Sequence, residues 1–319
     1  MVPSAIALVA IVLPAALLVD RLIGDPRSAW HPVALLGRFI GWWGRPSLYS
    51  PGIQRFTGLV LWLVTVLLFA APFYLFAALA PWYLYLVIAP FLLKCCFAWR
   101  SLEEHTLAVV NSLGEGIETG REKAKMLVSR DMSGLCREHI LSAGYESMTE
   151  NLTDSIISPL FYVTLFGFAG AIALTGAAVF RAANTMDAML GYRDERERIG
   201  WCAARMDDLL NFIPARITAL LLLVYFAQKG RFSPAVRVML RDGRNRPGFN
   251  GGIVMAAMAG GVGVRFEKPG VYTIGDGERM LDEAGADILR ATRMVTMMFA
   301  LIATGTLFLL GSLINSTAI

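Results

Sequence analysis

The sequence predicts an all-α, polytopic integral membrane protein with four firm membrane-spanning helices and two further helices that are ambiguous or re-entrant. The 319-residue chain is 56% hydrophobic and 17% charged, against about 45–50% and 25% in soluble proteins. Several uncharged runs also reach the roughly 20 residues needed to cross a bilayer. A soluble fold of this size could not bury so much apolar surface.

Residues 1–99 are expected to hold the first span and a helical hairpin. Residues 1–19 carry no charged side chain and lack the basic start and cleavage site of a signal peptide. Thirty-eight uncharged residues separate Arg55 from Lys94, about twice the length of one span. The Ala80-Pro81 pair supplies the turn between the two helices, and Lys94 is expected to reach the membrane interface.

The whole chain, 1–319, is predicted to form one membrane-embedded domain. Composition divides the part after residue 99 into four segments. Residues 100–154 combine charges with periodic apolar residues, which predicts amphipathic cytoplasmic helices. Segment 155–228 holds the two ambiguous helices, the first of which is interrupted by Pro and Gly. Segment 229–293 is polar, Gly-rich and expected in the cytoplasm, and 294–319 is uncharged and forms the last span.

The distribution of Arg and Lys predicts the orientation in the cell membrane. Basic residues gather after the first span and after the hairpin, whereas both termini lack charges. The positive-inside rule therefore places both termini outside and the charged loops, with the active site, in the cytoplasm. The net charge of +4 follows from these loops, and no long basic run indicates a nucleic-acid partner.

An acidic cluster precedes the first ambiguous helix. Glu146, Glu150 and Asp154 are spaced four residues apart and would share one face of a helix. Like charges so placed repel one another unless a cation lies between them, and Mg²⁺ binds carboxylates together with substrate phosphates. The alternative is a solvated acidic face that ends a helix.

Two further clusters adjoin apolar sequence. Asn184 and Asp187 share a helix face and could act together in a site. The alternative is that they only belong to the end of a helix that is capped at Gly191. Arg205, Asp207, Asp208, Asn211 and Arg216 lie beside an aliphatic run, where charged groups must pair or bind a ligand. Arg216 is expected to have an anionic partner, either Asp207 or Asp208 or a substrate phosphate or carboxylate.

Motifs of other enzyme classes are absent from the sequence. There is no Walker phosphate loop and no H-E-x-x-H zinc motif, and the three histidines give little support to a His-based triad. The four cysteines lack metal-ligand spacing, so neither a structural zinc site nor a disulfide framework is expected.

Five segments of the chain carry recognisable motifs: Gly24-Asp25-Pro26 with His31-Pro32-Val33, Ser129-Arg130-Asp131, the run from Glu146 to Phe161, Asn184 to Tyr192, and Ala204 to Arg216. Together they resemble the adenosylcobinamide-phosphate synthase family of cobalamin biosynthesis, CobD/CbiB. The match covers most of the chain, although Met132 and Ala188 depart from the family pattern, as does the segment 246–252.

The resemblance implies ATP-dependent formation of an amide between (adenosyl)cobyric acid and (R)-1-aminopropan-2-ol or its O-phosphate, with Mg²⁺ and ATP as co-substrate. Association with other membrane-bound enzymes of nucleotide-loop assembly is also expected. On this reading Glu146, Asp207 and Asp208 are catalytic, and Glu150, Asp154, Asp187 and Asp208 hold Mg²⁺. Substrate is bound by His31, Arg130, Asp131, Asn151, Asn184, Arg205, Asn211, Arg216 and Asn250.

Two other functional classes share the architecture. A transporter also buries charges in broken helices, but it should show an internal repeat, and none is visible. A regulatory membrane protein of the AmpE type would not need every acidic motif. The presence of all three clusters favours the enzyme.

Overall fold

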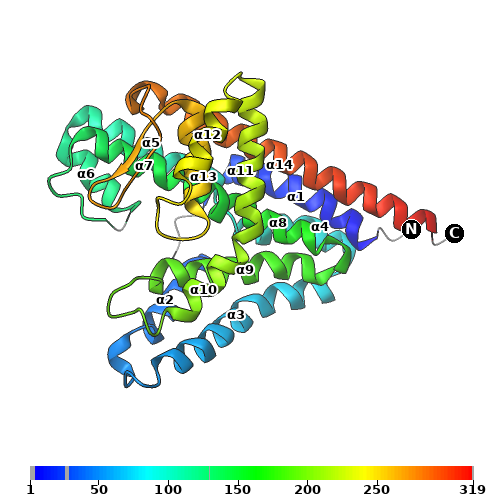
Figure 1. The fold of residues 1–319 in the computed structure, drawn as a ribbon. Coiled ribbons are helices and arrows are strands. Elements are labelled where there is room, and N and C mark those ends of the chain that lie inside the picture. The colour runs from blue at the N-terminus through cyan, green and yellow to red at the C-terminus, as the bar shows by residue number, and fades with distance from the viewer. Residues whose placement is uncertain (1–3, 26–28, 129, 318–319) are drawn as a thin grey trace. The chain divides into compact units, whose positions relative to one another are not determined.

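The computed structural model describes residues 4–25, 29–128 and 130–317, which are almost entirely helical (Figure 1). Four stretches are long and apolar enough to cross a membrane: Ala5–Ile23, Gln54–Leu79, Trp82–Glu115 and Leu281–Ile314. A pair of helices bent by 44°, Trp201–Leu210 and Phe212–Gln228, would make a fifth. The prediction of an all-α membrane protein with four firm spans is confirmed.

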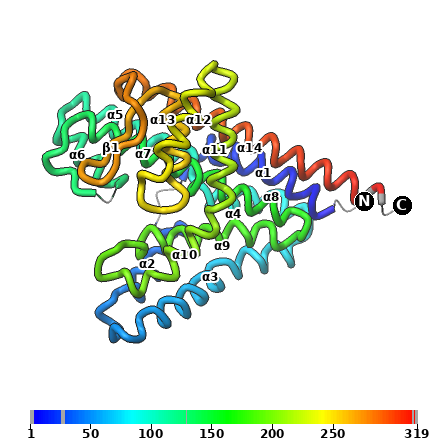
Figure 2. The backbone as a smooth tube through the Cα atoms, in the orientation of Figure 1, coloured from blue at the N-terminus to red at the C-terminus, as the bar shows by residue number. Residues whose placement is uncertain are grey.

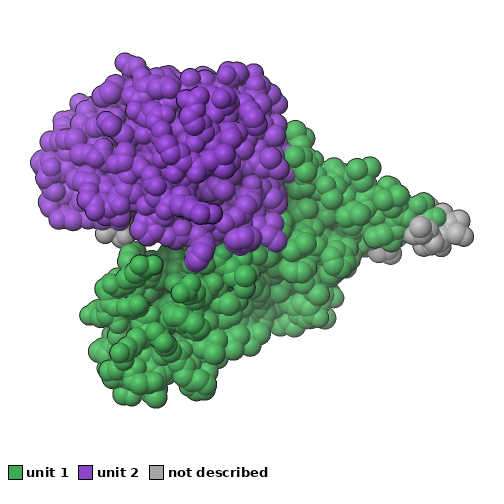
Figure 3. Space-filling model, in the orientation of Figure 1, with its two compact units in different colours: residues 1–98, 158–210, 300–319 green, residues 99–157, 211–299 purple. Residues whose placement is uncertain are grey.

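Contacts along the chain divide it into two compact units, coloured separately in Figure 3. Unit 1 comprises residues 1–98, 158–210 and 300–319, and unit 2 comprises residues 99–157 and 211–299. Two unit boundaries lie within three residues of the predicted boundaries at 99/100 and 154/155. The grouping into one membrane-embedded domain stays a prediction.

Unit 1 is built from seven helices and the C-terminal half of an eighth. They are α1 (Ala5–Ile23), α2 (Pro32–Trp43), α3 (Gln54–Leu79), α4 (Trp82–Lys94), α8 (Ser158–Leu165), α9 (Ala171–Leu190), α10 (Trp201–Leu210) and the end of α14 (Leu281–Thr317), with short 3₁₀ turns at Pro46–Leu48 and Gly167–Ala169. The predicted hairpin is present as α3 and α4, and Pro81 precedes the first turn of α4.

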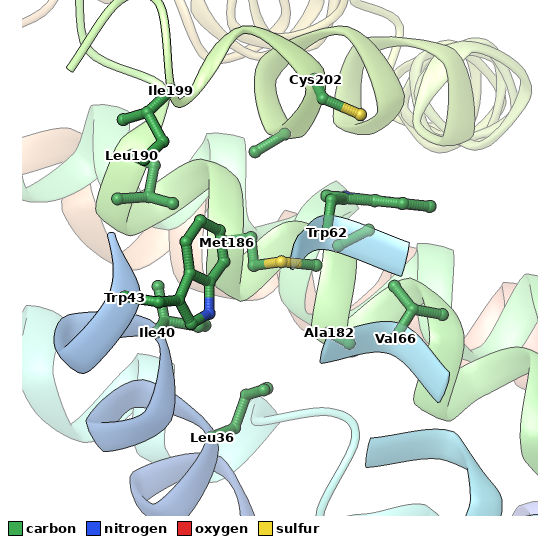
Figure 4. Packing of buried hydrophobic residues seen from close by; sticks show 12 residues of the cluster. Leu36, Ile40, Trp43, Trp62, Val66, Ala182, Met186, Leu190, Ile199 and Cys202 are labelled. Atoms are coloured by element: carbon green, nitrogen blue, oxygen red, sulfur yellow. The ribbon is translucent and has the colours of Figure 1, made fainter. Parts of the chain in front are cut away.

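The core of unit 1 lies between α2, α3 and α9. Figure 4 shows Met186 of α9 between Trp43 of α2 and Trp62 of α3, and all three side chains are buried. Gly58 allows α3 to approach the backbone near α10, because a Cβ at this position would collide with the carbonyl of Ile199. The second polar cluster, on α9, and the α10 part of the third, Arg205 to Asp208, are thereby attached to this packed core.

The uncharged run 155–180 does not form one crossing helix. A π-helical turn, Leu152–Ile157, leads into α8, and a break at residues 166–170 separates α8 from α9. Gly170 adopts φ +56°, a conformation that favours glycine. The irregularity expected from Pro and Gly is therefore present.

Unit 2 contains the helices that were expected in the charged segments and one β-hairpin. Its elements are α5 (Trp99–Glu115), α6 (Ile117–Lys125), α7 (Arg137–Asn151), the π-helical turn, α11 (Phe212–Gln228), α12 (Phe232–Asp242), α13 (Gly251–Val262), β1 (Phe266–Lys268), β2 (Tyr272–Ile274) and the first part of α14. Gly116 separates α5 from α6, and the apolar stretch that begins in α4 continues into α5.

The β-hairpin lies against α7 (Figure 2). Its strands are antiparallel, and Lys268 pairs with Tyr272 across a turn in which Gly270 has φ +72°. The predicted all-α fold contained no strands, and two strands of three residues are too short to show an alternating pattern in the sequence. The last helix also begins at Leu281, thirteen residues before the predicted span.

Candidate active site

Glu146 of α7 lies at the centre of a buried polar network in unit 2. Its carboxylate accepts three hydrogen bonds of 2.5 Å, from Arg130 Nη2, Ser142 Oγ and Tyr272 Oη. The Glu146 side chain is only 3% exposed. Three donors around one carboxylate compensate for the loss of its hydration.

The helical repeat of α7 places the network's acidic residues together. Ser142, Glu146 and Glu150 follow one another at intervals of four residues and so share one face. The Ser142 hydroxyl also accepts a hydrogen bond of 2.7 Å from the backbone N–H of Glu267 in β1. This bond ties the β-hairpin to α7 and brings Tyr272 to Glu146.

The next carboxylate, Glu150, is bound by Arg246. Arg246 Nη2 lies 2.5 Å from Glu150 Oε1. Burial lowers the pKa of Arg246, but Glu150, Tyr272 and Asp154 together outweigh this effect and leave that pKa raised. Gly251 leaves room for the guanidinium, since a Cβ there would lie 2.6 Å from Arg246 Nη1.

Lys268 supplies a third cation beside these carboxylates. Burial, and then the positive charge of Arg130, lower its pKa, while Glu146 opposes the shift. Within the described parts of the chain its ammonium forms no hydrogen bond or ion pair. We refer to Arg130, Ser142, Glu146, Glu150, Arg246, Lys268 and Tyr272 as the α7 cluster; its three cations exceed its two carboxylates by one charge.

Tyr272 remains a hydrogen-bond donor within the α7 cluster. Burial, and then the charge of Glu146, raise the pKa of its hydroxyl. The phenol therefore keeps its proton and donates a hydrogen bond to the Glu146 carboxylate. The excess cation and these fixed donors suit a bound anion with several oxygens, such as a phosphate.

The predicted Mg²⁺ ligands are distributed over both units. Glu150 and Asp154 belong to unit 2, and Asp187 and Asp208 belong to unit 1. Arg130 and Arg246 provide the positive charge that the spacing of Glu146 and Glu150 led us to expect. The described residues contain no group of three potential ligands that could by itself hold a metal ion. The Mg²⁺ site stays a prediction.

Two predicted substrate-binding residues of unit 2 are held by local hydrogen bonds. Asp131 accepts bonds from the Ser133 hydroxyl and N–H, which lower its pKa. Asn151 donates to the Ser147 carbonyl at 2.9 Å and accepts from the Ser155 hydroxyl at 2.8 Å. Asn151 thus links α7 to the π-helical turn, an irregularity that is frequent at functional sites.

Arg216 is bound by neutral groups in the described part of unit 2. In the described structure its guanidinium donates to Asn250 Oδ1 at 2.5 Å and to the carbonyls of Phe212 and Phe249 at 3.0 and 3.2 Å. It also stacks on the Phe212 ring, 3.8 Å from the centroid. Neutral oxygens and an aromatic face surround the guanidinium in place of a carboxylate. The substrate phosphate or carboxylate that was named as the other possible partner stays a prediction. Asn211, at the start of the same helix, is buried.

His31, from the first quoted motif, lies in a charged network of unit 1. Its Nδ1 accepts a hydrogen bond from the Val33 N–H at the start of α2, and its Nε2 lies 3.8 Å from Asp25. Burial lowers the pKa of His31, and Asp25 opposes the shift. Lys94 does not reach toward solvent as expected but is buried between Asp25 and Asp20. Pro26 and Ser129 of the quoted motifs lie outside the described residues.

The remaining predicted residues connect α9 with α10. Asn184 donates to Asp207 Oδ1 at 3.1 Å, which joins the second and third motifs in unit 1. Asp187 occupies the space beside Gly191, where any side chain would collide with its carboxylate. Asp208 is half-buried, and Arg205 is exposed. The catalytic and binding roles assigned to these residues stay predictions.

Sequence reasoning missed four members of the α7 cluster: Ser142, Arg246, Lys268 and Tyr272. Ser142 precedes Glu146 by one helical turn, a spacing that could have indicated it. Arg246 begins the segment that departs from the family pattern. Lys268 and Tyr272 reach α7 only through the short hairpin, which no periodicity revealed.

Comparisons with known proteins agree with this picture. The family model described as CobD/Cbib protein matches residues 13–298. The probable cobalamin biosynthesis protein CobD of Methanothermobacter thermautotrophicus is 40% identical over 306 residues, which cover 94% of this chain and 98% of that protein. The probable CobD of Thermococcus kodakarensis is 40% identical, covering 90% and 93%.

A bacterial relative, the cobalamin biosynthesis protein CobD of Dehalococcoides mccartyi, is 37% identical over 83% of this chain and 86% of its own. No solved structure matches. The family model spans most of the chain, and archaeal and bacterial relatives align over nearly their full lengths. This multi-pass membrane protein therefore belongs to the CobD/CbiB family of cobalamin biosynthesis.

Proposed function

We propose that this protein joins a propionate carboxylate of (adenosyl)cobyric acid to the amine of (R)-1-aminopropan-2-ol or its O-phosphate, at the expense of ATP. Family membership supports the pathway. The α7 cluster is the observation that carries the chemistry, because three cations surround two buried or half-buried carboxylates on one helix face. Such a site favours a phosphate-bearing substrate.

The reaction requires activation of a poor electrophile. The carboxylate oxygen attacks the γ-phosphorus of ATP, giving an acyl phosphate and ADP. The amine then attacks the acyl carbon, the C–O bond to phosphate breaks, and the amide, inorganic phosphate and a proton are released. Phosphoryl transfer depends mainly on positioning and on stabilisation of charge.

In this proposal the cations of the α7 cluster hold the transferring phosphate. Lys268 donates to a phosphate oxygen without first breaking an ion pair, and the planar guanidinium of Arg246 can bind two oxygens at once. Mg²⁺ arriving with ATP would be held by Glu150 and Asp154 and would neutralise phosphate charge. Glu150 and Asp154 each offer one carboxylate, which suits an ion that takes its other ligands from phosphates and water.

Glu146 is assigned a positioning role. Its carboxylate already accepts bonds from Arg130, Ser142 and Tyr272, so its main effect is to fix the direction of Arg130. We assign removal of the proton from the attacking amine to Asp207, whose carboxylate accepts from Asn184. ATP is a cytoplasmic substrate, so we place the α7 cluster on the cytoplasmic side. Association with other membrane-bound enzymes of the pathway is part of the same proposal.

Reconstitution of the full chain in lipid nanodiscs tests this function. Mass spectrometry would follow the formation of adenosylcobinamide phosphate from adenosylcobyric acid, aminopropanol phosphate, ATP and Mg²⁺, with each component omitted in turn. We expect Lys268→Gln and Arg246→Gln to lower kcat/KM by about tenfold to a hundredfold, as for loss of a charge-assisted hydrogen bond.

Lys123→Gln, which removes an exposed lysine of α6, is the control and should retain full activity. Absence of an amide product with either amine would refute the proposed function. Full activity of both cluster variants would instead move the phosphate site away from α7.

A further inference from the structure

A basic cleft lies in unit 2, apart from the residues of the α7 cluster. It has a volume of about 280 Å³, and its buried floor is formed by Tyr225 and Phe226 of α11 and by Gly261 and Val262 of α13. Gly261 keeps the floor open to Phe226, because a Cβ would collide with that ring. The charged lining residues are Lys229, Arg231, Arg279, Asp287 and Arg290.

Two of the cations have structural partners. Arg231 pairs with Glu278 at 2.7 Å and donates to the Gly261 carbonyl at 3.2 Å, at the C-terminus of α13. Arg279 donates to Asp287 at 2.8 Å and reaches the Val262 carbonyl. These contacts cap the C-terminal end of α13, where backbone carbonyls without a partner in the helix attract cations.

The other two cations are poorly compensated. Arg290 shares the single carboxylate of Asp287 with Arg279, at 2.8 Å to each. Lys229 has no carboxylate partner among the described residues; its ammonium lies 6.0 Å from the centre of the Tyr225 ring. Four cations against Asp287 and Glu278 leave two positive charges in excess.

Tyr225 adds an unused donor to the same cleft. The residue is only 5% exposed and lines the cleft floor, within the electrostatic reach of Arg290 and Asp287. Its hydroxyl has no hydrogen-bond partner in the described part of the chain. Because Tyr225 lines the cleft, this hydroxyl is available to donate to a ligand bound there.

The cleft lies where apolar helices become charged. The uncharged stretch of α11 ends at Lys229, and the uncharged stretch of α14 begins after Arg293, one turn beyond Arg290. Such transitions between apolar and charged sequence mark the membrane–water interface, where the phosphates of lipids are found.

We propose that this cleft binds a phosphate-bearing anion, with Lys229, Arg290 and the Tyr225 hydroxyl as its ligands. The same chemistry is offered by the headgroup of an anionic phospholipid and by a free phosphate. The site is separate in residues from the α7 cluster, so it stands or falls independently of the proposed ligation.

The test uses the full chain in a neutral maltoside detergent. One arm titrates fluorescently labelled phosphatidylglycerol, with phosphatidylcholine as the zwitterionic comparison; the other adds inorganic phosphate as a competitor. The variants are Lys229→Gln, Arg290→Gln and Tyr225→Phe, with Lys123→Gln as the matched control. Size-exclusion chromatography and circular dichroism establish that each variant is folded.

We expect Lys229→Gln and Arg290→Gln each to weaken anion binding by about tenfold, the loss expected for one charge-assisted hydrogen bond. Tyr225→Phe keeps the ring packing and should weaken binding by about threefold to tenfold. The control should be unchanged. Binding of phosphatidylglycerol that phosphate does not displace identifies a lipid site, whereas binding of phosphate alone identifies a free-anion site.

Two results would overturn the proposal. One is equal affinity of wild type and all three cleft variants for both probes, which would place anion binding elsewhere. The other is equal binding of phosphatidylglycerol and phosphatidylcholine with no effect of phosphate, which would show that the cleft does not select a net negative charge.

Discussion

The guanidinium of Arg130 and the carboxylate of Glu146 form an ion pair of 2.5 Å, with side chains 11% and 3% exposed. Removal of one partner leaves the other charge without its counter-ion in a dry site. Breaking a buried pair in this way costs about 3–5 kcal/mol of stability, whereas removing both charges costs much less. The pair therefore couples the loop before α7 to the α7 cluster.

Arg130→Gln and Glu146→Gln should each destabilise the protein strongly, and the double variant should recover part of the loss. A double-mutant cycle on the free energy of unfolding measures the coupling, which we expect to exceed about 1 kcal/mol. Strictly additive effects would show that the two charges do not depend on each other.

The lowered pKa of Lys268 predicts how anion binding varies with pH. The folded protein releases this proton at a lower pH than the ordinary lysine value of 10.5. Between the two pKa values the unfolded chain holds more protons, so this residue makes stability rise with pH there. The positive charge is lost over the same window, and ATP affinity should fall as pH rises through it.

Lys268→Arg is the matched variant, because a guanidinium keeps its charge throughout that range. Equilibrium binding of ATP between pH 7 and pH 10 measures the effect. We expect a decline in the wild type and a flatter curve in the variant. Identical curves would show that Lys268 does not contact the nucleotide.

Gly191 should be intolerant of any side chain, because Asp187 fills the space a Cβ would need. Gly191→Ala would displace the Asp187 carboxylate, lower activity and cost about 1–3 kcal/mol of stability. Gly52→Ala is the control, since a Cβ there meets no described heavy atom within 4 Å. Turnover and thermal unfolding measure both changes; equal behaviour of the two variants would contradict the packing at Asp187.

The orientation in the membrane can be read from Cys136, a free and exposed thiol at the start of α7. A membrane-impermeant maleimide should label it in inside-out vesicles and not in intact cells. An added cysteine at Ala80, in the turn between α3 and α4, should show the opposite pattern in a Cys136→Ser background. Labelling of Cys136 from outside would reverse the proposed topology.

The spans were predictable because each depends on a local property of the chain. An uncharged run such as residues 56–79 has few alternatives to a helix in a membrane, and Pro81 marks its end. The hairpin of β1 and β2 was not predictable, because three-residue strands carry no periodic signal and are held by packing against α7.

From residue spacing alone the candidate site was predictable only on α7, and Arg130 was added by the family resemblance. The spacing of Glu146 and Glu150 showed a shared helix face, and the need for positive charge between them followed from electrostatics. Which cation would meet that need could not be read locally, since Arg246 lies 96 residues from Glu150 along the chain. For Arg216, the charge indicated the need for a partner but not which one, and the amide oxygen of Asn250, 34 residues away along the chain, could not be read locally.

The central claim is that ATP activates the corrinoid carboxylate as an acyl phosphate, and oxygen transfer tests it most directly. Cobyric acid labelled with ¹⁸O in the reacting carboxylate, incubated with the protein, ATP, Mg²⁺ and aminopropanol phosphate, should yield one labelled oxygen in inorganic phosphate for each amide formed. ADP should appear in equal amount. Formation of the amide without transfer of ¹⁸O to inorganic phosphate would contradict the account.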